Sequence, residues 1–246
     1  MAKKFKDYYN KKCAELLSEK ISDFCPDFDA DGFVAVVSRG IVGKEFLARQ
    51  DVFVEAFEQF LPGPYTRNVK IFMRILGEKL KTTEGMFIHG WWLWPVGRYV
   101  EKHGCEDYDL SMNFIYELTQ RFTGEFAIRP FLKKFPQETL RWMFVWSKDE
   151  NVHVRRLASE GVRISLPWAK KSLVFIEHFS LARKILDWLR NDSEKFVQKS
   201  VANNLNDLYK IDSRKAQMIV DGWQREGVSL QTAWIIKHGQ RSFRKK

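Results

Sequence analysis

The chain has 246 residues, 45% hydrophobic and 29% charged, so it can bury a large core and has the composition of a globular protein. No apolar run reaches the about 18 residues needed to span a membrane, and the basic N-terminus MAKKFKDYYNKK lacks the apolar segment of a signal peptide. Three cysteines share no CxxC spacing, so we expect reduced thiols in a cytosolic protein, with neither a disulfide framework nor a metal site.

The net charge of +10 is concentrated in the second half of the chain. Residues 1–120 hold 16 Lys and Arg against 18 Asp and Glu, a net charge of −2, whereas residues 121–246 hold 25 against 13, a net charge of +12. A basic half beside a near-neutral half is typical of a phosphate-binding surface. A solvated, lysine-rich helical surface would give the same count, so charge alone leaves both interpretations open.

The first half of the chain is predicted to be helical. Apolar residues recur at helical spacing over residues 1–22, 33–61, 69–80 and 109–121, with breaks at glycine and proline. The aromatic run at 86–104 could offer a stacking platform for bases, but such a cluster more often belongs to a core. No segment shows the two-residue alternation of a strand.

The stretch from Trp146 to Trp168, WSKDENVHVRRLASEGVRISLPW, predicts a helix-turn-helix unit. Asn151 and the two acids before it suit a helix N-terminus. Gly161 suits a helix end, where a left-handed residue is common. Pro167 suits the first turn of a second helix.

A shift of 43 residues aligns this unit with a second one, DSEKFVQKSVANNLND. Asp149 falls on Asp192 and Arg155 on Gln198, and the apolar stripe is kept. Paired helices with a period near 40–47 residues are the signature of HEAT and armadillo repeats. We therefore predict an all-α fold in which residues 1–246 form a single HEAT-like domain. Antiparallel helix pairs would build an α-solenoid with a concave basic groove.

The remaining segments continue the same pattern. Helix pairs are predicted at 172–179 with 182–190 and at 212–225 with 229–237, and the basic tail GQRSFRKK at 239–246 suits phosphate contact. The chain contains no GxGxxG, no P-loop and no Ser/His/Asp arrangement, so we expect no cofactor.

Three stretches carry a resemblance to a known family: GEFAIRPFL at 124–132, WSKDENVHVRRLASEGVRISLPWA at 146–169, and SVANNLNDLYK at 200–210. In this order and spacing they resemble the bacterial DNA alkylation repair glycosylases built from HEAT-like repeats, of the AlkC type within the AlkC/AlkD superfamily. The similarity runs over nearly the whole chain. Some members carry a C-terminal immunoglobulin-like domain, and this sequence resembles the shorter form that lacks it.

The resemblance implies a DNA glycosylase of base excision repair, a hydrolase that excises N3-methylated bases from duplex DNA, chiefly 3-methyladenine and 3-methylcytosine. The family's active-site positions match Glu125, Glu160, Trp168 and Asp207, with Arg156 as a backbone-binding residue beside them. Because no lysine lies in a marked apolar segment, we expect a monofunctional enzyme that leaves the strand uncut. We expect a monomer in the bacterial cytosol and nucleoid.

The residue types suit this chemistry. A cationic base is already a good leaving group, and a carboxylate stabilises the oxocarbenium-like sugar or aligns the attacking water. An indole adds cation–π attraction to a cationic base. Salt-dependent contacts to phosphate carry no sequence preference, and the candidates are Arg129, Arg156, Arg163, Lys170, Lys171 and Lys199.

Each site residue also has a purely structural interpretation. Glu160 can pair with Arg156 four residues earlier on an exposed helix face, Asp207 can end a helix, Glu125 can interact with a helix dipole, and Trp168 can lie in the core. The rival function is a non-catalytic HEAT-like module that binds nucleic acid or protein. Convergence of the carboxylates would distinguish the two, because carboxylates in a basic groove weaken DNA binding.

Overall fold

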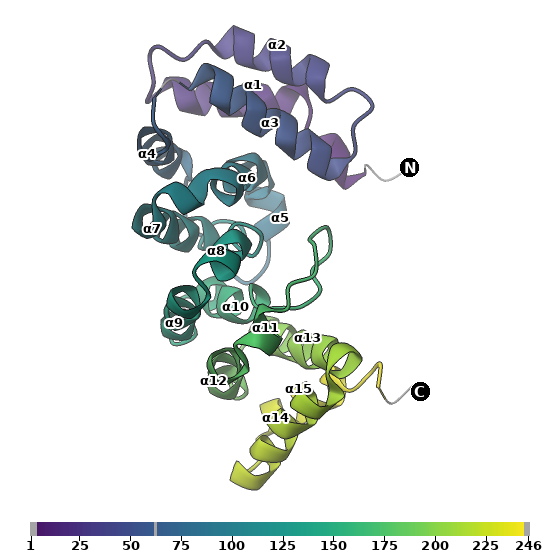
Figure 1. The fold of residues 1–246 in the computed structure, drawn as a ribbon. Coiled ribbons are helices and arrows are strands. Elements are labelled where there is room, and N and C mark those ends of the chain that lie inside the picture. The colour runs from purple at the N-terminus through teal and green to yellow at the C-terminus, as the bar shows by residue number, and fades with distance from the viewer. Residues whose placement is uncertain (1–3, 62, 244–246) are drawn as a thin grey trace. The chain divides into compact units, whose positions relative to one another are not determined.

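The computed structural model describes residues 4–61 and 63–243. These residues form helices and no strand, which confirms the predicted all-α class (Figure 1). Contacts within the chain divide it into two compact units, Met1–Ala127 and Ile128–Lys246. The division falls close to the point at which the sequence becomes basic. The grouping of the whole chain into one domain and the concave groove stay predictions.

Helices in the first unit pack against neighbours in sequence and against helices further along the chain. Its elements are η1 Phe5–Tyr8, α1 Lys11–Ser22, α2 Ala30–Gly40, α3 Phe46–Phe60, α4 Tyr65–Ile75, α5 Met86–His89, η2 Trp91–Leu93, α6 Trp94–His103, η3 Gly104–Glu106 and α7 Tyr108–Thr119. Helix α2 contacts α1 and α3, α3 contacts α6, and α4 contacts α7. Trp94 of the aromatic run is buried, as expected for a core residue.

The helix predicted over residues 1–22 is shorter in the structure. It begins at Lys11, because the Asn10 side chain accepts a hydrogen bond from the Lys12 N–H at 2.9 Å and so caps the first turn. Residues 5–8 form a separate 3-10 turn. Residues 1–3 of the predicted helix lie outside the described residues.

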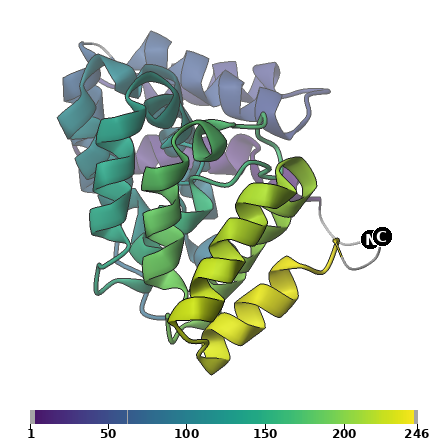
Figure 2. The same cartoon turned by 60° about the horizontal axis from the view of Figure 1, so that its bottom comes forward.

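The second unit is built from two layers of helices. Its helices are α8 Arg129–Lys134, α9 Pro136–Trp146, α10 Val152–Glu160, α11 Val174–Glu177, α12 Phe179–Leu189, α13 Lys195–Ile211, α14 Ser213–Glu226 and α15 Leu230–Gly239. Helices α9, α12 and α14 contact one another in series and form one layer. Helices α10, α13 and α15 form the second layer, with α14 and α15 at the yellow end of the chain (Figures 1 and 2).

The two copies of the predicted repeat begin with the same local structure. Asp149 Oδ1 accepts a hydrogen bond from the backbone N–H of Asn151 at 2.8 Å, and Asp192 Oδ1 accepts one from the N–H of Glu194 at 2.8 Å. Each aspartate therefore closes a turn immediately before α10 or α13. This equivalence supports the 43-residue shift.

The next aligned pair, Arg155 and Gln198, also has one structural role. Arg155 Nη1 donates to the carbonyl of Asp149 at 3.0 Å, and Gln198 Nε2 donates to the carbonyl of Asp192 at 2.7 Å. Each side chain reaches back over the turn that precedes its helix and satisfies a carbonyl there. Arg155 makes a further contact, to the carboxylate of Asp192 in the following repeat.

Two local expectations about the central stretch are wrong. Gly161 ends α10 with a φ of −63° and not in the left-handed region. Glycine is required there by packing, because a Cβ would lie 2.8 Å from both Ile128 Cγ2 and Met143 Cε. Pro167 starts no helix: the chain runs through a loop from Gly161 until α11 begins at Val174.

The link between the repeats can be tested at Arg155. Its Nε and Nη2 donate to the two oxygens of Asp192 at 2.7 and 3.4 Å, and the Asp192 side chain is buried. We expect Arg155→Ala to lower the free energy of unfolding by about 3 kcal/mol, because a buried carboxylate loses its partner. Arg155→Gln should lose less, since Gln198 makes the equivalent carbonyl contact. Urea denaturation measures both, and wild-type stability of Arg155→Ala would contradict this role.

Candidate active site

Two of the predicted catalytic carboxylates meet at one arginine. Glu160 is the last residue of α10, and Asp207 lies on α13. Arg163 Nη1 donates to Glu160 Oε1 at 2.7 Å, and Arg163 Nε donates to Asp207 Oδ2 at 3.1 Å. Both carboxylates are buried, with 5% and 4% of their surfaces exposed. The packing of α10 against α13 therefore brings them together.

Glu160 is held on both of its oxygens. Oε1 also lies 3.4 Å from Arg156 Nη2, and Oε2 accepts a hydrogen bond from the Ser200 hydroxyl at 2.6 Å. Burial opposes ionisation of Glu160, but the charges of Arg156 and Arg163 and the Ser200 hydroxyl hold its pKa below the ordinary value. The expected exposed pair with Arg156 is thus a buried one, because α13 covers that face of α10.

Arg163 carries the opposite charge in this cluster. Burial opposes its protonated form, but Glu160 and Asp207 raise its pKa above the ordinary value. Its guanidinium therefore stays positive between the two carboxylates, and its side chain is 12% exposed.

Asp207 keeps one oxygen open. Oδ2 accepts hydrogen bonds from Arg163 and from the backbone N–H of Ser165, the latter at 3.3 Å. Oδ1 accepts no hydrogen bond from any residue that the structure describes, and the Asp207 side chain is 5% exposed. Asp207 is therefore anchored through one oxygen while the other can accept a hydrogen bond from water or a ligand.

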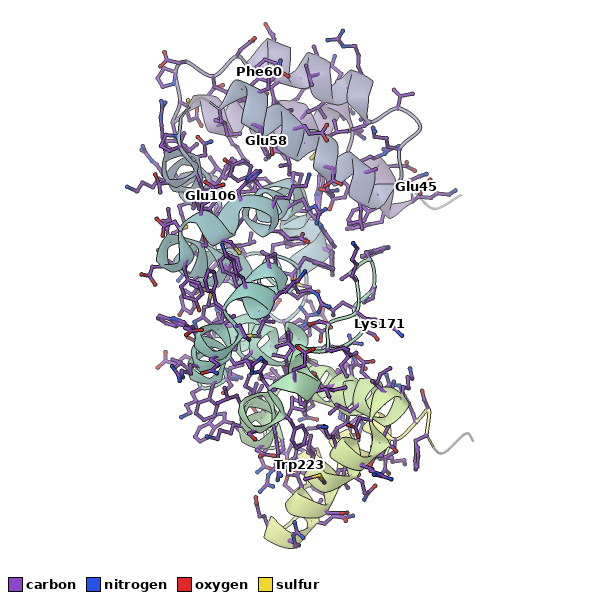
Figure 3. The ribbon with its side chains drawn as sticks, in the orientation of Figure 1. Glu45, Glu58, Phe60, Glu106, Lys171 and Trp223 are labelled. Carbon is purple, nitrogen blue, oxygen red and sulfur yellow. The ribbon has the colours of Figure 1, made fainter. Side chains whose placement is uncertain are left out.

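Trp168 lies on the long loop between α10 and α11 (Figure 1). Its surface is 51% exposed, so the core interpretation of this residue is wrong. Its φ of 60° lies in the left-handed region, which is a strained conformation for a bulky side chain and is often found at functional sites. The exposed lysines Lys170 and Lys171 follow on the same loop, where Figure 3 labels Lys171.

The predicted phosphate-binding residues fall into two groups. Lys170, Lys171 and Lys199 are exposed and can reach a phosphate. The arginines contact protein groups: Arg156 and Arg163 pair with Glu160, and Arg129 donates to backbone carbonyls. Contact of any of the six with phosphate stays a prediction.

Arg241 is a site residue that the sequence did not single out. Its Nη2 donates to Asn203 Oδ1 on α13 at 2.8 Å. Its pKa is lowered by burial and by the charge of Arg163, while Asp207 acts in the opposite direction, so it lies near the charged cluster. The basic composition of the tail was the signal for this residue, but the packing of α15 on α13 selected it. Residues 244–246 of that tail lie outside the described residues.

Glu125 is described within the first unit. It is 6% exposed and lies in a turn at the C-terminal end of that unit, and not inside a helix as its predicted position suggested. Its catalytic role stays a prediction.

Neither a metal site nor a membrane span is found among the described residues. No group of three or more His, Cys, Asp or Glu side chains among them is placed to hold a metal ion. No helix in the described part of the chain is long and apolar enough to cross a membrane.

Comparison with known proteins adds to this geometry. Residues 123–227 match the family described as DNA alkylation repair enzyme. The uncharacterized protein YhaZ of Bacillus subtilis is 34% identical over 245 residues, which covers 98% of this chain and 65% of YhaZ. The structure of the Pseudomonas fluorescens alkylpurine DNA glycosylase AlkC, bound to DNA containing an abasic site analog, is similar with a TM-score of 0.86 and 32% identity. That similarity covers 100% of this chain and 66% of the AlkC chain.

The buried ion pair of Glu160 predicts a pH-dependent stability. At neutral pH we expect Glu160→Gln to lower the free energy of unfolding by about 3 kcal/mol, because the partly buried Arg156 loses its counter-charge and Arg163 keeps only that of Asp207. The pKa of Glu160 is lowered in the folded state, so its contribution is fully present above the ordinary glutamate pKa of about 4.3 and is lost as the pH falls through the folded value. Wild type and variant should therefore converge in acid.

Urea denaturation from neutral to strongly acidic pH measures this difference. Glu177→Gln, which alters an exposed carboxyl in α11, is the matched control and should change little. A difference between wild type and Glu160→Gln that stays constant with pH would contradict the assignment.

Proposed function

We propose that the chain is a DNA glycosylase of base excision repair, because residues 123–227 match the family described as DNA alkylation repair enzyme and the whole chain is similar to the AlkC structure. Its substrates are cationic N3-alkylated bases, 3-methyladenine and 3-methylcytosine, in duplex DNA. The observation that carries the proposal is Asp207, whose Oδ1 accepts no hydrogen bond from a described residue, beside the ion pair of Glu160 and Arg163. The enzyme acts as a monomer in the bacterial cytosol, without a cofactor.

The placement of the carboxylates supports catalysis over simple binding. The second half of the chain carries a net charge of +12, which favours phosphate. Two ionised carboxylates inside such a surface weaken the attraction to DNA and add nothing to a binding module. They are useful where a positive charge develops during a reaction.

The proposed reaction begins with departure of the base. The glycosidic bond breaks, and its electron pair passes to the cationic base, which leaves as a neutral molecule. The sugar carbon becomes oxocarbenium-like, as in glycoside hydrolysis. Water then adds to that carbon and loses a proton, so the products are the free base and an abasic site.

Asp207 is the group proposed to act on the reacting atoms. The Oδ1 oxygen stabilises the developing positive sugar and accepts a hydrogen bond, and then the proton, from the attacking water. Arg163 and the Ser165 N–H fix the other oxygen, so the carboxylate is oriented before substrate arrives.

Glu160 has a different role from Asp207 in this proposal. Its oxygens are occupied by Arg156, Arg163 and Ser200, so it balances the arginine charges and keeps Arg163 in place. This assignment makes Glu160 a positioning residue, and Asp207 the one that meets water.

Trp168 provides an aromatic face for the cationic base or sugar. Cation–π attraction of this kind contributes about 0.5–2 kcal/mol. The half-exposed indole on a loop can contact a base that remains largely within the DNA. A positively charged base needs little further activation as a leaving group, so it does not have to enter a deep pocket. No lysine is assigned to a Schiff base, so the strand is left uncut.

The catalytic proposal is tested by base release from methylated duplex DNA. We expect Asp207→Asn to reduce release of 3-methyladenine by on the order of 10²–10³. Binding to undamaged DNA should be kept or improved, because one negative charge is removed. Single-turnover release and equilibrium binding measure the two effects.

Glu177→Gln is the matched control, since it removes an exposed carboxyl from the same unit and should leave release unchanged. If a folded wild-type protein binds DNA and releases no methylated base, the glycosylase proposal fails. The non-catalytic binding module would then remain.

The DNA-binding surface is tested by salt dependence. Lys199 on α13 and Arg241 beyond α15 are proposed to neutralise one phosphate each. We expect Lys199→Gln or Arg241→Gln to reduce the slope of log affinity against log salt by about 0.9. Lys184→Gln, on α12 in the other helix layer, is the control and should leave the slope unchanged. If neither Lys199→Gln nor Arg241→Gln changes the slope, these two residues do not contact phosphate.

A further inference from the structure

Arg129 makes two hydrogen bonds that its predicted role in phosphate binding does not explain. Nη1 donates to the backbone carbonyl of Arg163 at 3.0 Å, and Nη2 donates to the backbone carbonyl of Lys170 at 2.6 Å. Arg129 is the first residue of α8, so a helix of the scaffold holds two points of the loop that carries Trp168.

These two carbonyls lie on opposite sides of the loop. Arg163 comes before the turn and Lys170 after it, with Trp168 between them. The same base is closed by a hydrogen bond from the Ser172 N–H to the Ile164 carbonyl at 3.0 Å. The guanidinium therefore bridges the two arms of the loop.

The conformation of Trp168 requires such support. A left-handed φ is unfavourable for a residue with a β-carbon and persists only where the surrounding structure imposes it. Half of the Trp168 surface is exposed, so packing around the indole restrains it only in part. The hydrogen bonds from Arg129 to the two arms of the loop supply a further restraint.

Arg163 connects this anchor to the carboxylates. The carbonyl of Arg163 accepts from Arg129, while its side chain holds Glu160 and Asp207. Ser165, two residues later, donates its N–H to Asp207. One continuous set of hydrogen bonds thus runs from α8 through the loop base to Asp207.

We propose that Arg129 is a positioning residue that fixes Trp168 relative to Asp207 by bridging the two arms of the loop. The role of Trp168 in this inference rests on the proposed glycosylase function. Arginine suits the task because its planar guanidinium presents several N–H donors in a fixed fork, whereas lysine presents one point charge.

The test compares Arg129→Gln and Arg129→Lys with wild type. Hydrogen exchange of the amides at 164–172 should become faster in both variants, while α10 and α13 keep their protection. Single-turnover release of 3-methyladenine should fall on the order of 10-fold to 10²-fold, as expected when reacting groups are misplaced by about 1 Å. The concentration of DNA for half-maximal rate should stay unchanged.

Two further measurements separate positioning from phosphate contact. Arg129→Gln combined with Trp168→Ala should be no slower than Trp168→Ala alone, because the first change acts through the second residue. The salt slope of DNA binding should be that of wild type, whereas loss of a phosphate contact would reduce it by about 0.9. Lys133→Gln, an exposed position on α8, is the matched control.

Additive losses in the double variant, a reduced salt slope, or unchanged exchange at 164–172 would each overturn the inference. If Arg129→Gln fails to fold, the same measurements are made on Arg129→Lys, which keeps the positive charge. If wild type releases no base, the proposed function fails, and the exchange measurement still decides whether Arg129 holds the loop.

Discussion

The second unit depends on one arrangement, the guanidinium of Arg163 between the carboxylates of Glu160 and Asp207. A carboxylate buried without a partner would lose several kcal/mol of hydration free energy and would tend to take up a proton. Arg163 places a positive charge between both carboxylates, which are 5% and 4% exposed, and it helps to hold the pKa of Glu160 below the ordinary value. Since Glu160 ends α10 and Asp207 lies on α13, the cluster also fixes how these two helices pack.

The same arrangement gives the two carboxylates different properties. Both oxygens of Glu160 have polar partners, whereas Asp207 Oδ1 accepts no hydrogen bond from a described residue. Main-chain groups next to Arg163 extend the cluster into the loop, because the Arg163 carbonyl accepts from Arg129 and the Ser165 N–H donates to Asp207. A strained, half-exposed tryptophan is thereby held on the same framework as the carboxylate.

The repeat explains why the site forms between corresponding helices of successive repeats, α10 and α13. Asp149 and Asp192 close equivalent turns, and Arg155 and Gln198 reach back to equivalent carbonyls. Each repeat thus begins in the same way, and the helix after this turn packs against the corresponding helix of the next repeat. The site arises where one such pair, α10 and α13, carries charged residues on its contact face in place of apolar ones. Arg155 pairs with Asp192 of the next repeat and so links the same two repeats near the other end of α10.

Local patterns in the sequence determined the helical class and indicated the 43-residue repeat, and they predicted Glu160 and Asp207 as site residues, because periodicity, capping and family motifs are properties of short stretches. These local patterns did not determine which side chains are exposed or which partners the side chains meet. Gly161 looked like a helix stop and is a packing contact, Pro167 looked like a helix start and lies in a loop, and the Arg156–Glu160 pair looked like a surface pair and is buried. Arg129 donates to carbonyls of the loop, and Arg241 came to the site through the packing of α15 on α13. Which groups become buried, and which carbonyl or carboxylate an arginine meets, depends on segments far apart in sequence, so the tertiary structure alone decided them.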